Sequence, residues 1–212
     1  MADDYRSTKY CPELTDLQGK KDSVRRTILA QHPRARDMHT YISDNDKPFK
    51  ELFLDVYNGK CAYCGVSIKI IPWKMFEIDH LIPRTAKRFG RKKANAGYMD
   101  NLVLSCYDCN RAKSNFEVRD EELQKIHPDK TGITESFTRD DDYYIRISDE
   151  MEADETVTSF YKEVDLGNQL HRIDYLLLNM YGLCESISNE HPAYGRLMDA
   201  VSCLQEKRNV VR

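Results

Sequence analysis

The sequence predicts an α+β protein, a mainly helical chain around one small β-containing centre that a four-cysteine zinc site braces. Two Cys-x-x-Cys pairs, Cys61/Cys64 and Cys106/Cys109, enclose short segments of β-type composition, and helical spacing appears on both sides of them. Thiolates two residues apart converge on one ion, so two such pairs at matched spacing predict one tetrahedral structural zinc site.

Composition predicts one compact unit without a membrane segment. The 212 residues are 41% hydrophobic, which is enough for one core, and no apolar run approaches the roughly 20 residues of a membrane span. Outside the two pairs, Cys11, Cys184 and Cys203 are scattered, which is not a disulfide framework. We therefore expect a cytoplasmic protein.

The segment before the first cysteine pair predicts an arm and three helices. Residues 1–20 show no convincing period and are expected to form a loosely ordered arm. The expected helices are one capped by Asp22 or Ser23 and ended by Pro33, a short one over 38–42, and one from Pro48 to Asn58 with a single apolar face. We expect these helices to pack on the zinc-bound centre.

Between and after the cysteine pairs, the pattern alternates between β-type and loop segments. Residues 66–71 are β-rich, and Phe76 and Ile78 would share the buried face of a strand over 75–80. A long basic loop over 84–100, a strand over 102–104 and a helix over 108–116 should follow, and a 17-residue loop in a compact domain is usually functional. In that helix, Asn110 and Lys113 would share one face.

These residues carry a resemblance to a known family. The sequences EIDHLIPR, NLVLSC and CNRAK, together with both cysteine pairs, resemble the HNH endonuclease motif. The resemblance covers residues 61 to 113, about a quarter of the chain. It implies the ββα-metal finger fold, in the subgroup whose finger is braced by a four-cysteine zinc. Asn110 stands where some members of the family have His.

The resemblance implies a role for each motif residue. His80 would be the general base that takes a proton from the attacking water. Asp79 and Asn110 would hold one divalent ion, for which Mg²⁺ or Mn²⁺ suits oxygen ligands better than a second Zn²⁺. Asn101 would orient the His80 ring by accepting its Nδ1 proton through an amide or backbone oxygen. The remaining histidines have no partner at ligand spacing and are interpreted as ordinary: His32, His39, His127, His171 and His191.

Charge is strongly segregated along the chain. Residues 60–119 hold 12 Lys and Arg against 5 Asp and Glu, whereas residues 120–165 hold 5 against 15. A basic stretch inside a metal motif predicts phosphate contacts with DNA, although a solvated charged loop is the alternative. The candidate contacts are Arg84, Lys87, Arg88, Arg91, Lys92, Lys93 and Lys113. The acidic run that follows is interpreted as solvated surface, with mimicry of nucleic acid or docking on a basic partner as the alternatives.

The C-terminal part predicts a strand over 143–147 and two helices. Apolar residues spaced by three and four predict a first helix of about six turns, and Pro192 starts the second. The stripe on the first helix consists of Leu166, Leu170, Ile173, Leu177, Met180, Cys184 and Ile187. Such a stripe usually belongs to a core, here under the last helix and the N-terminal helices; partner binding is the alternative.

The order of parts is similar to the small HNH nucleases of bacterial anti-phage systems. The cues are His127-Pro128, a short aromatic strand and the sequence from Leu176 to Asn179. Nucleases of the Septu type and of some retrons work beside an SMC-like ATPase, so the resemblance implies such a partner. We expect an N-terminal helical segment over 1–59, the nuclease core over 60–118, and an acidic and helical segment over 119–212 that offers docking surface.

Two functional hypotheses remain. One is a metal-dependent endonuclease that cuts phosphodiester bonds in DNA as the effector of a defence system. The other is a catalytically inactive, zinc-braced module that binds nucleic acid or protein. The complete set Asp79, His80, Asn101 and Asn110 favours the nuclease, because a binding module would not need a base beside hard metal ligands.

Overall fold

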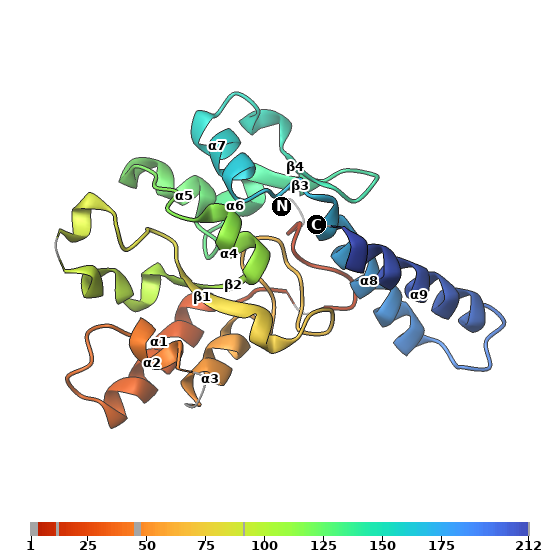
Figure 1. Cartoon of the computed structure of the whole chain (residues 1–212), viewed down its shortest axis with the longest axis horizontal. Coiled ribbons are helices and arrows are strands. Elements are labelled where there is room, and N and C mark those ends of the chain that lie inside the picture. Colours follow the sequence, from red (N-terminus) through yellow and green to blue (C-terminus); the bar gives the residue numbers. More distant parts are fainter. Residues whose placement is uncertain (1–3, 12, 45–47, 91, 212) are drawn as a thin grey trace.

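The computed structural model describes residues 4–11, 13–44, 48–90 and 92–211. Short helices surround two small antiparallel sheets, and two long C-terminal helices project from one side (Figure 1). The predicted fold class, a mainly helical α+β chain around a cysteine-braced centre, is confirmed. In the described part of the chain, no helix is both long and apolar enough to cross a membrane.

The centre is a ββα unit. Strand β1 (Phe76–His80) pairs antiparallel with β2 (Leu102–Cys106), with Phe76 opposite Cys106 and His80 opposite Leu102. Helix α4 (Tyr107–Lys113) follows β2 directly and ends where Ser114 takes a φ of 47°. Phe76 and Ile78 are buried, as predicted, and all five residues of β2 are buried. The two strands and the helix thus form the scaffold of the candidate site.

The connection between β1 and β2 is ordered by short turns rather than being a plain loop. Three 3-10 turns lie within it, η2 (Lys87–Phe89), η3 (Lys93–Gly97) and η4 (Met99–Asn101). Apolar side chains of this connection form a small core of their own around Ile82, Ala86, Phe89 and Ala96. The expected β-rich segment 66–71 is instead a turn, and Ser67 makes only an isolated bridge to Lys60.

The three N-terminal helices lie on one side of the central strands (Figure 1). They are α1 (Leu17–Gln31), α2 (His39–Ile42) and α3 (Phe49–Val56). Helix α1 begins earlier than predicted, because Asp16 caps it by accepting a hydrogen bond from the Gly19 amide. On α3, for which a single apolar face was expected, Phe53 is fully buried but Leu52 is 38% exposed.

The prediction of a loosely ordered N-terminal arm is wrong for the described residues. Tyr5 and Arg6 are buried, and the Tyr5 hydroxyl donates to the Tyr63 carbonyl at 2.5 Å. Arg6 donates to the carbonyls of Ala62 and Pro128, both at 2.8 Å. The arm therefore joins the first cysteine turn to the segment after the finger, because a buried guanidinium must find acceptors.

After the finger, the chain builds a small second layer and then the helical hairpin. The elements are α5 (Leu123–Ile126), α6 (Gly132–Ser136), β3 (Phe137–Arg139), β4 (Ile145–Ile147), α7 (Glu155–Glu163), α8 (Gln169–Ser186) and α9 (Tyr194–Val210). Helix α8 is shorter than predicted, because Asn168 caps it by accepting from the Leu170 amide. It packs on α9 through Ile173, Leu177 and Val201, and the two helices run side by side (Figure 1).

Candidate active site and metal centre

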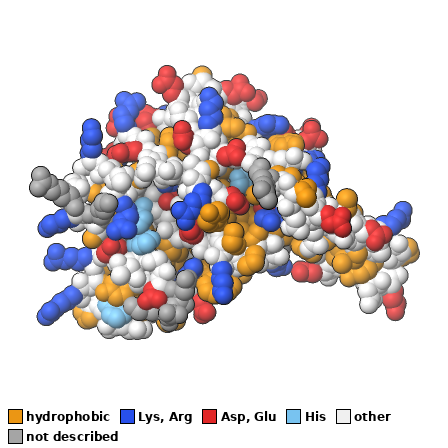
Figure 2. Space-filling view, viewed as in Figure 1, with side chains coloured by type: hydrophobic (Ala, Val, Ile, Leu, Met, Phe, Trp, Pro, Cys, Tyr) orange, Lys and Arg blue, Asp and Glu red, His pale blue; other side chains and the backbone are white. Residues whose placement is uncertain are grey.

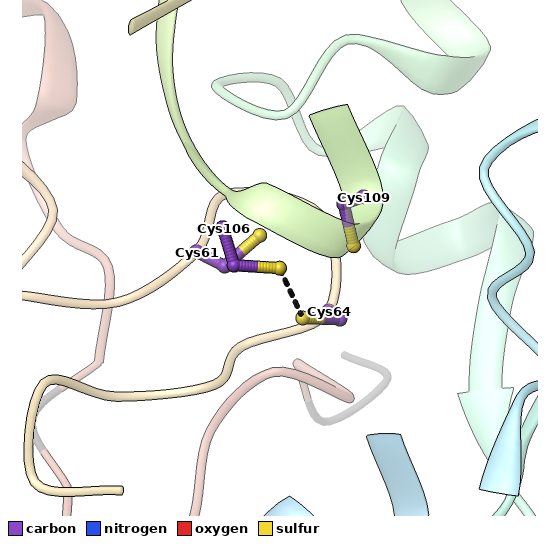
Figure 3. A group of neighbouring side chains, drawn as sticks. All are labelled: Cys61, Cys64, Cys106 and Cys109. Carbon is purple, nitrogen blue, oxygen red and sulfur yellow. Dashed lines mark hydrogen bonds between the residues drawn. The ribbon is translucent and has the colours of Figure 1, made fainter. Parts of the chain in front are cut away.

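The four predicted cysteines converge in one buried cluster. Their sulfur atoms all lie within 4.8 Å of one another, and Cys64 Sγ is 3.8 Å from Cys106 Sγ (Figure 3). A tetrahedral zinc ion with Zn–S bonds of about 2.3 Å holds its sulfurs about 3.8 Å apart. Burial also raises the pKa of the Cys109 thiol well above its usual value, and a bound cation would favour its thiolate. The four cysteines can therefore hold a metal ion, and they fit zinc.

Local backbone geometry explains why the sulfurs meet. The first pair lies in a tight turn in which the Cys61 amide donates to the Val66 carbonyl at 2.8 Å. Gly65 closes that turn with a φ of 82°, and a Cβ there would lie 2.7 Å from the Arg6 carbonyl oxygen, so only glycine fits. Cys106 ends β2, and Cys109 lies in the first turn of α4.

His171 of α8 lies against the cysteine cluster. Its Nε2 is 3.8 Å from Cys109 Sγ, and the residue is buried. Burial lowers the pKa of His171, so the ring is neutral at pH 7 and carries one N–H, which can donate to the sulfur. His171 was interpreted from the sequence as an ordinary histidine without a partner at ligand spacing. In the structure it contacts a cysteine of the cluster and so joins α8 to the finger.

Asp79 and His80 lie side by side on β1, and alternation along the strand turns their side chains to opposite faces. On one face, Asp79 Oδ2 accepts from the Tyr63 hydroxyl at 2.6 Å and lies 3.1 Å from Lys113 Nζ. Burial raises the pKa of Asp79, and both Lys113 and Tyr63 oppose that shift. The buried carboxyl thus lies beside one positive charge and one hydroxyl donor.

Asn110 lies on the same side of the finger as Asp79. Its amide Nδ2 donates to Glu77 Oε2, and Arg111 donates to the other Glu77 oxygen at 2.9 Å. Glu77 and Asp79 are two residues apart on β1 and share a face. The Asp79 carboxylate and the Asn110 amide oxygen are hard donors of the kind that Mg²⁺ and Mn²⁺ prefer, so these two residues fit such an ion by their chemistry, while Glu77 holds the Asn110 amide. Among the described residues, the four cysteines are the only group of three or more His, Cys, Asp or Glu side chains close enough together to hold one metal ion.

On the other face of β1, the His80 imidazole lies against His39. The two ring centroids are 4.4 Å apart with planes inclined by 33°. Burial lowers the pKa of His80 to about 3, and the nearby His39, Arg84 and Lys113 act in the same direction. At pH 7 the ring is neutral, so one nitrogen is available to accept a proton. His39, interpreted from the sequence as ordinary, is in fact a direct neighbour of His80.

Asn101 does not make the hydrogen bond expected of it. Its Oδ1 accepts from the Ile82 amide at 2.8 Å, and its backbone oxygen accepts from the Leu81 amide at 2.8 Å. Its Nδ2 donates to the carbonyls of Ile82 and Ala96 at 3.0 and 2.8 Å. The side chain therefore fixes the loop that follows His80 instead of holding the His80 ring, because that loop would otherwise bury unpaired backbone groups.

The predicted basic contacts separate into different environments. Arg84, Lys87 and Lys92 are exposed, and Figure 2 shows Lys and Arg side chains gathered along the edge where this connection lies. Arg88 pairs with Asp120 and donates to the Val118 carbonyl at 3.1 Å. Arg91 lies outside the described residues, as does the side chain of Lys93.

Lys113 differs from the exposed phosphate contact that was expected. It is 1% exposed, and its ammonium donates to the His80 carbonyl at 3.0 Å while pairing with Asp79. The helix geometry explains the difference, since the face shared by Asn110 and Lys113 packs onto β1 rather than facing solvent. Lys113 thus lies in the interior of the domain and holds the Asp79 carboxylate and the His80 backbone.

Sequence reasoning missed four side chains that touch the site. Glu77 could have been found from its spacing, two residues before Asp79 on the predicted strand. Tyr63, His39 and His171 carry no local signal, because each reaches the site through contacts with residues distant in the sequence.

Comparison with known proteins agrees with this geometry. The family model for HNH endonuclease matches residues 61–116, a range that contains both cysteine pairs, β1, β2 and α4. Residues 61–116 form an HNH endonuclease domain.

The HNH endonuclease domain covers about a quarter of the chain, and a curated relative extends the likeness. The chain is 31% identical over 86 residues to the Septu protein PtuB of Bacillus mycoides (strain KBAB4). That alignment covers 36% of this chain and 28% of the relative, so the chain matches less than a third of the relative's length. No solved structure matches the chain.

Proposed function

We propose that the chain is a metal-dependent HNH endonuclease that hydrolyses phosphodiester bonds in DNA. The observation that carries the proposal is the placement of His80 and Asp79 on adjacent positions of β1, braced by α4, within the HNH domain. A neutral, buried imidazole next to a buried carboxylate is a combination that can activate water beside a divalent ion.

His80 takes the proton from the attacking water in this proposal. Its ring is neutral at pH 7, because burial and the neighbouring positive charges disfavour the imidazolium. A pKa of about 3 would make a weak base, but a phosphate group close to the ring adds negative charge and raises that pKa. Arg84 lies near enough to act on His80 and is exposed, so it can meet the same phosphate.

Asp79 and Asn110 would hold the divalent ion, and Glu77 would fix the Asn110 amide through their hydrogen bond. The ion, when bound, polarises the scissile phosphate and stabilises the leaving oxygen. Lys113 competes with the ion for the Asp79 carboxylate and at the same time keeps that carboxylate ionised. The zinc ion held by the four cysteines would only brace the fold, because all four of its positions are filled by protein.

DNA would reach this site along the basic connection. Arg84, Lys87 and Lys92 are exposed there, and Lys and Arg contacts to phosphates bind through release of counterions. Arg88 is held by Asp120 and contributes less.

The likeness to the Septu protein PtuB supports a place in bacterial anti-phage defence. The Septu protein PtuB shares the aligned region, and a defence nuclease inside the cytoplasm needs restraint. The chain has no Gly-x-x-x-x-Gly-Lys-Ser/Thr phosphate-binding loop of its own. We infer that an SMC-like or other ATPase supplies this restraint and binds residues 120–212. On the projecting hairpin of α8 and α9, hydrophobic side chains lie next to charged ones (Figure 2).

The test is cleavage by purified protein of plasmid, single-stranded DNA and RNA in Mg²⁺, in Mn²⁺ and in chelator. The proposal expects DNA cleavage that requires a divalent ion and is weak without the partner. Tight nucleic-acid binding without cleavage under every condition, including addition of the co-purifying ATPase, would favour the inactive module. Cleavage of RNA alone would replace the DNA substrate.

A further inference from the structure

Helix α2 delivers an aromatic ring to the candidate active site from outside the HNH domain. His39 is the first residue of α2 and lies 22 residues before the first residue of that domain. Its ring centroid is 4.4 Å from that of His80, close enough for the two rings to be in van der Waals contact. Nothing in the HNH motif specifies this neighbour.

The His39 ring lies beside the strand that carries His80. The backbone of Ile78, two residues before His80 on β1, is close enough to act on the pKa of His39 and raises it, against the larger effect of burial. In the described part of the chain, β1 pairs with β2 along one edge, and its other edge leaves backbone groups open to neighbouring side chains. His39 therefore lies against both the ring of His80 and the backbone of the strand that carries it.

Contacts with the connection between β1 and β2 hold the backbone just before His39. The Met38 amide donates to the Gly97 carbonyl at 2.7 Å, and Met38 and Ile42 are buried. A Cβ on Gly97 would lie 1.8 Å from Asp37 Oδ1 and 3.3 Å from Asp37 Cα, so the connection runs close against the residue that precedes Met38. Burial lowers the pKa of His39, which keeps the ring neutral beside His80, although Asp37 opposes the shift.

We propose that His39 is a positioning residue, whose ring covers one face of the His80 imidazole and fixes its orientation toward the attacking water. The role expected of Asn101 is thus filled from another part of the chain, because both Asn101 oxygens are used by the loop after His80. The N-terminal segment is then part of the catalytic unit. This inference rests on the proposed nuclease function.

His32 provides a matched control. Its ring lies 4.6 Å from that of Tyr41 with an inclination of 31°, nearly the same geometry as the pair of His39 and His80, in the same N-terminal segment. Replacing His32 therefore removes an equivalent ring contact without touching His80. Zinc content and thermal unfolding of every variant show whether the fold is kept.

The test combines steady-state cleavage kinetics with NMR of the histidine rings. His39→Ala should lower kcat by about 10- to 100-fold with KM unchanged, because small misplacements of a catalytic group cost this much. His39→Phe keeps a flat ring and should cleave faster than His39→Ala, while His32→Ala should match the parent. The His80 ring signals, identified by their loss in His80→Ala, should shift in His39→Ala and stay in place in His32→Ala.

Several outcomes would overturn the positioning role. These are an unchanged or increased rate for His39→Ala, a loss that appears in KM alone, or a His39→Phe variant as slow as His39→Ala. Unmoved His80 signals would overturn it too. The NMR measurement does not require cleavage, so a protein without nuclease activity would refute the proposed function while the contact between the rings is still tested.

Discussion

Asn101 offers a quantitative test of how the loop after His80 is held. The residue is 1% exposed, and its side chain makes three hydrogen bonds of 2.8 to 3.0 Å to the backbone of Ile82 and Ala96. Asn101→Ala leaves three backbone groups without these partners. At about 1 kcal/mol of net free energy for each hydrogen bond, the free energy of unfolding should fall by about 3 kcal/mol. This is a large part of the 5–15 kcal/mol typical of domains.

Urea unfolding of the zinc-loaded protein measures this loss. The midpoint should fall while the slope m is unchanged, because the substitution alters the stability and not the surface exposed on unfolding. Asn95→Ala is the control within the same connection, since Asn95 is exposed and, among the described residues, its side chain makes only a 3.5 Å contact with the Phe89 carbonyl. Asn101→Asp should lose more than Asn101→Ala, because a carboxylate would face two carbonyl oxygens. A loss within about 0.5 kcal/mol of the Asn95→Ala value would refute the bracing role.

Three further predictions concern zinc, pH and DNA. Cys109→Ser should lose zinc and cooperative unfolding, whereas Cys203→Ser, at an exposed cysteine, should keep both; elemental analysis that finds zinc in folded Cys109→Ser would contradict this. Burial lowers the pKa of His127 to about 4, so between about pH 6.5 and 4 this side chain is protonated in the unfolded chain and neutral in the folded chain. Stability should therefore fall as pH drops from about 6.5 to about 4, and His127→Asn should flatten that slope in acid titrations; an identical slope would count against it. Lys87→Ala and Lys92→Ala should each reduce the salt dependence of DNA affinity by about one unit of slope, and the paired Arg88 should matter less; equal effects of all three would contradict the pairing.

The sequence predicted those parts of the site that short-range patterns determine. Metal-ligand spacing identified the four cysteines, alternation placed Phe76 and Ile78 on the buried face of β1, and helical spacing put Asn110 and Lys113 on one face. Each of these inferences needs only a few neighbouring residues. The fold class followed from the same local signals.

Contacts between distant segments were not predictable in the same way. His39 meets His80, Arg6 bonds to the carbonyl of Pro128, and His171 reaches Cys109 from α8. These contacts depend on how whole elements pack, and a single sequence holds no periodicity that encodes such packing. For the same reason Lys113 was expected at the surface, although the face that it shares with Asn110 packs on β1.

The single-turnover rate of DNA cleavage by His80→Ala tests the assigned chemistry most directly. His191→Ala, at an exposed histidine beyond α8, is the control, and zinc content shows that the domain is intact. Removing a general base should slow cleavage by about 10²–10⁴-fold in Mg²⁺ or Mn²⁺ while the control is unchanged. Cleavage by His80→Ala at the parent rate would contradict the assignment of His80 as the base.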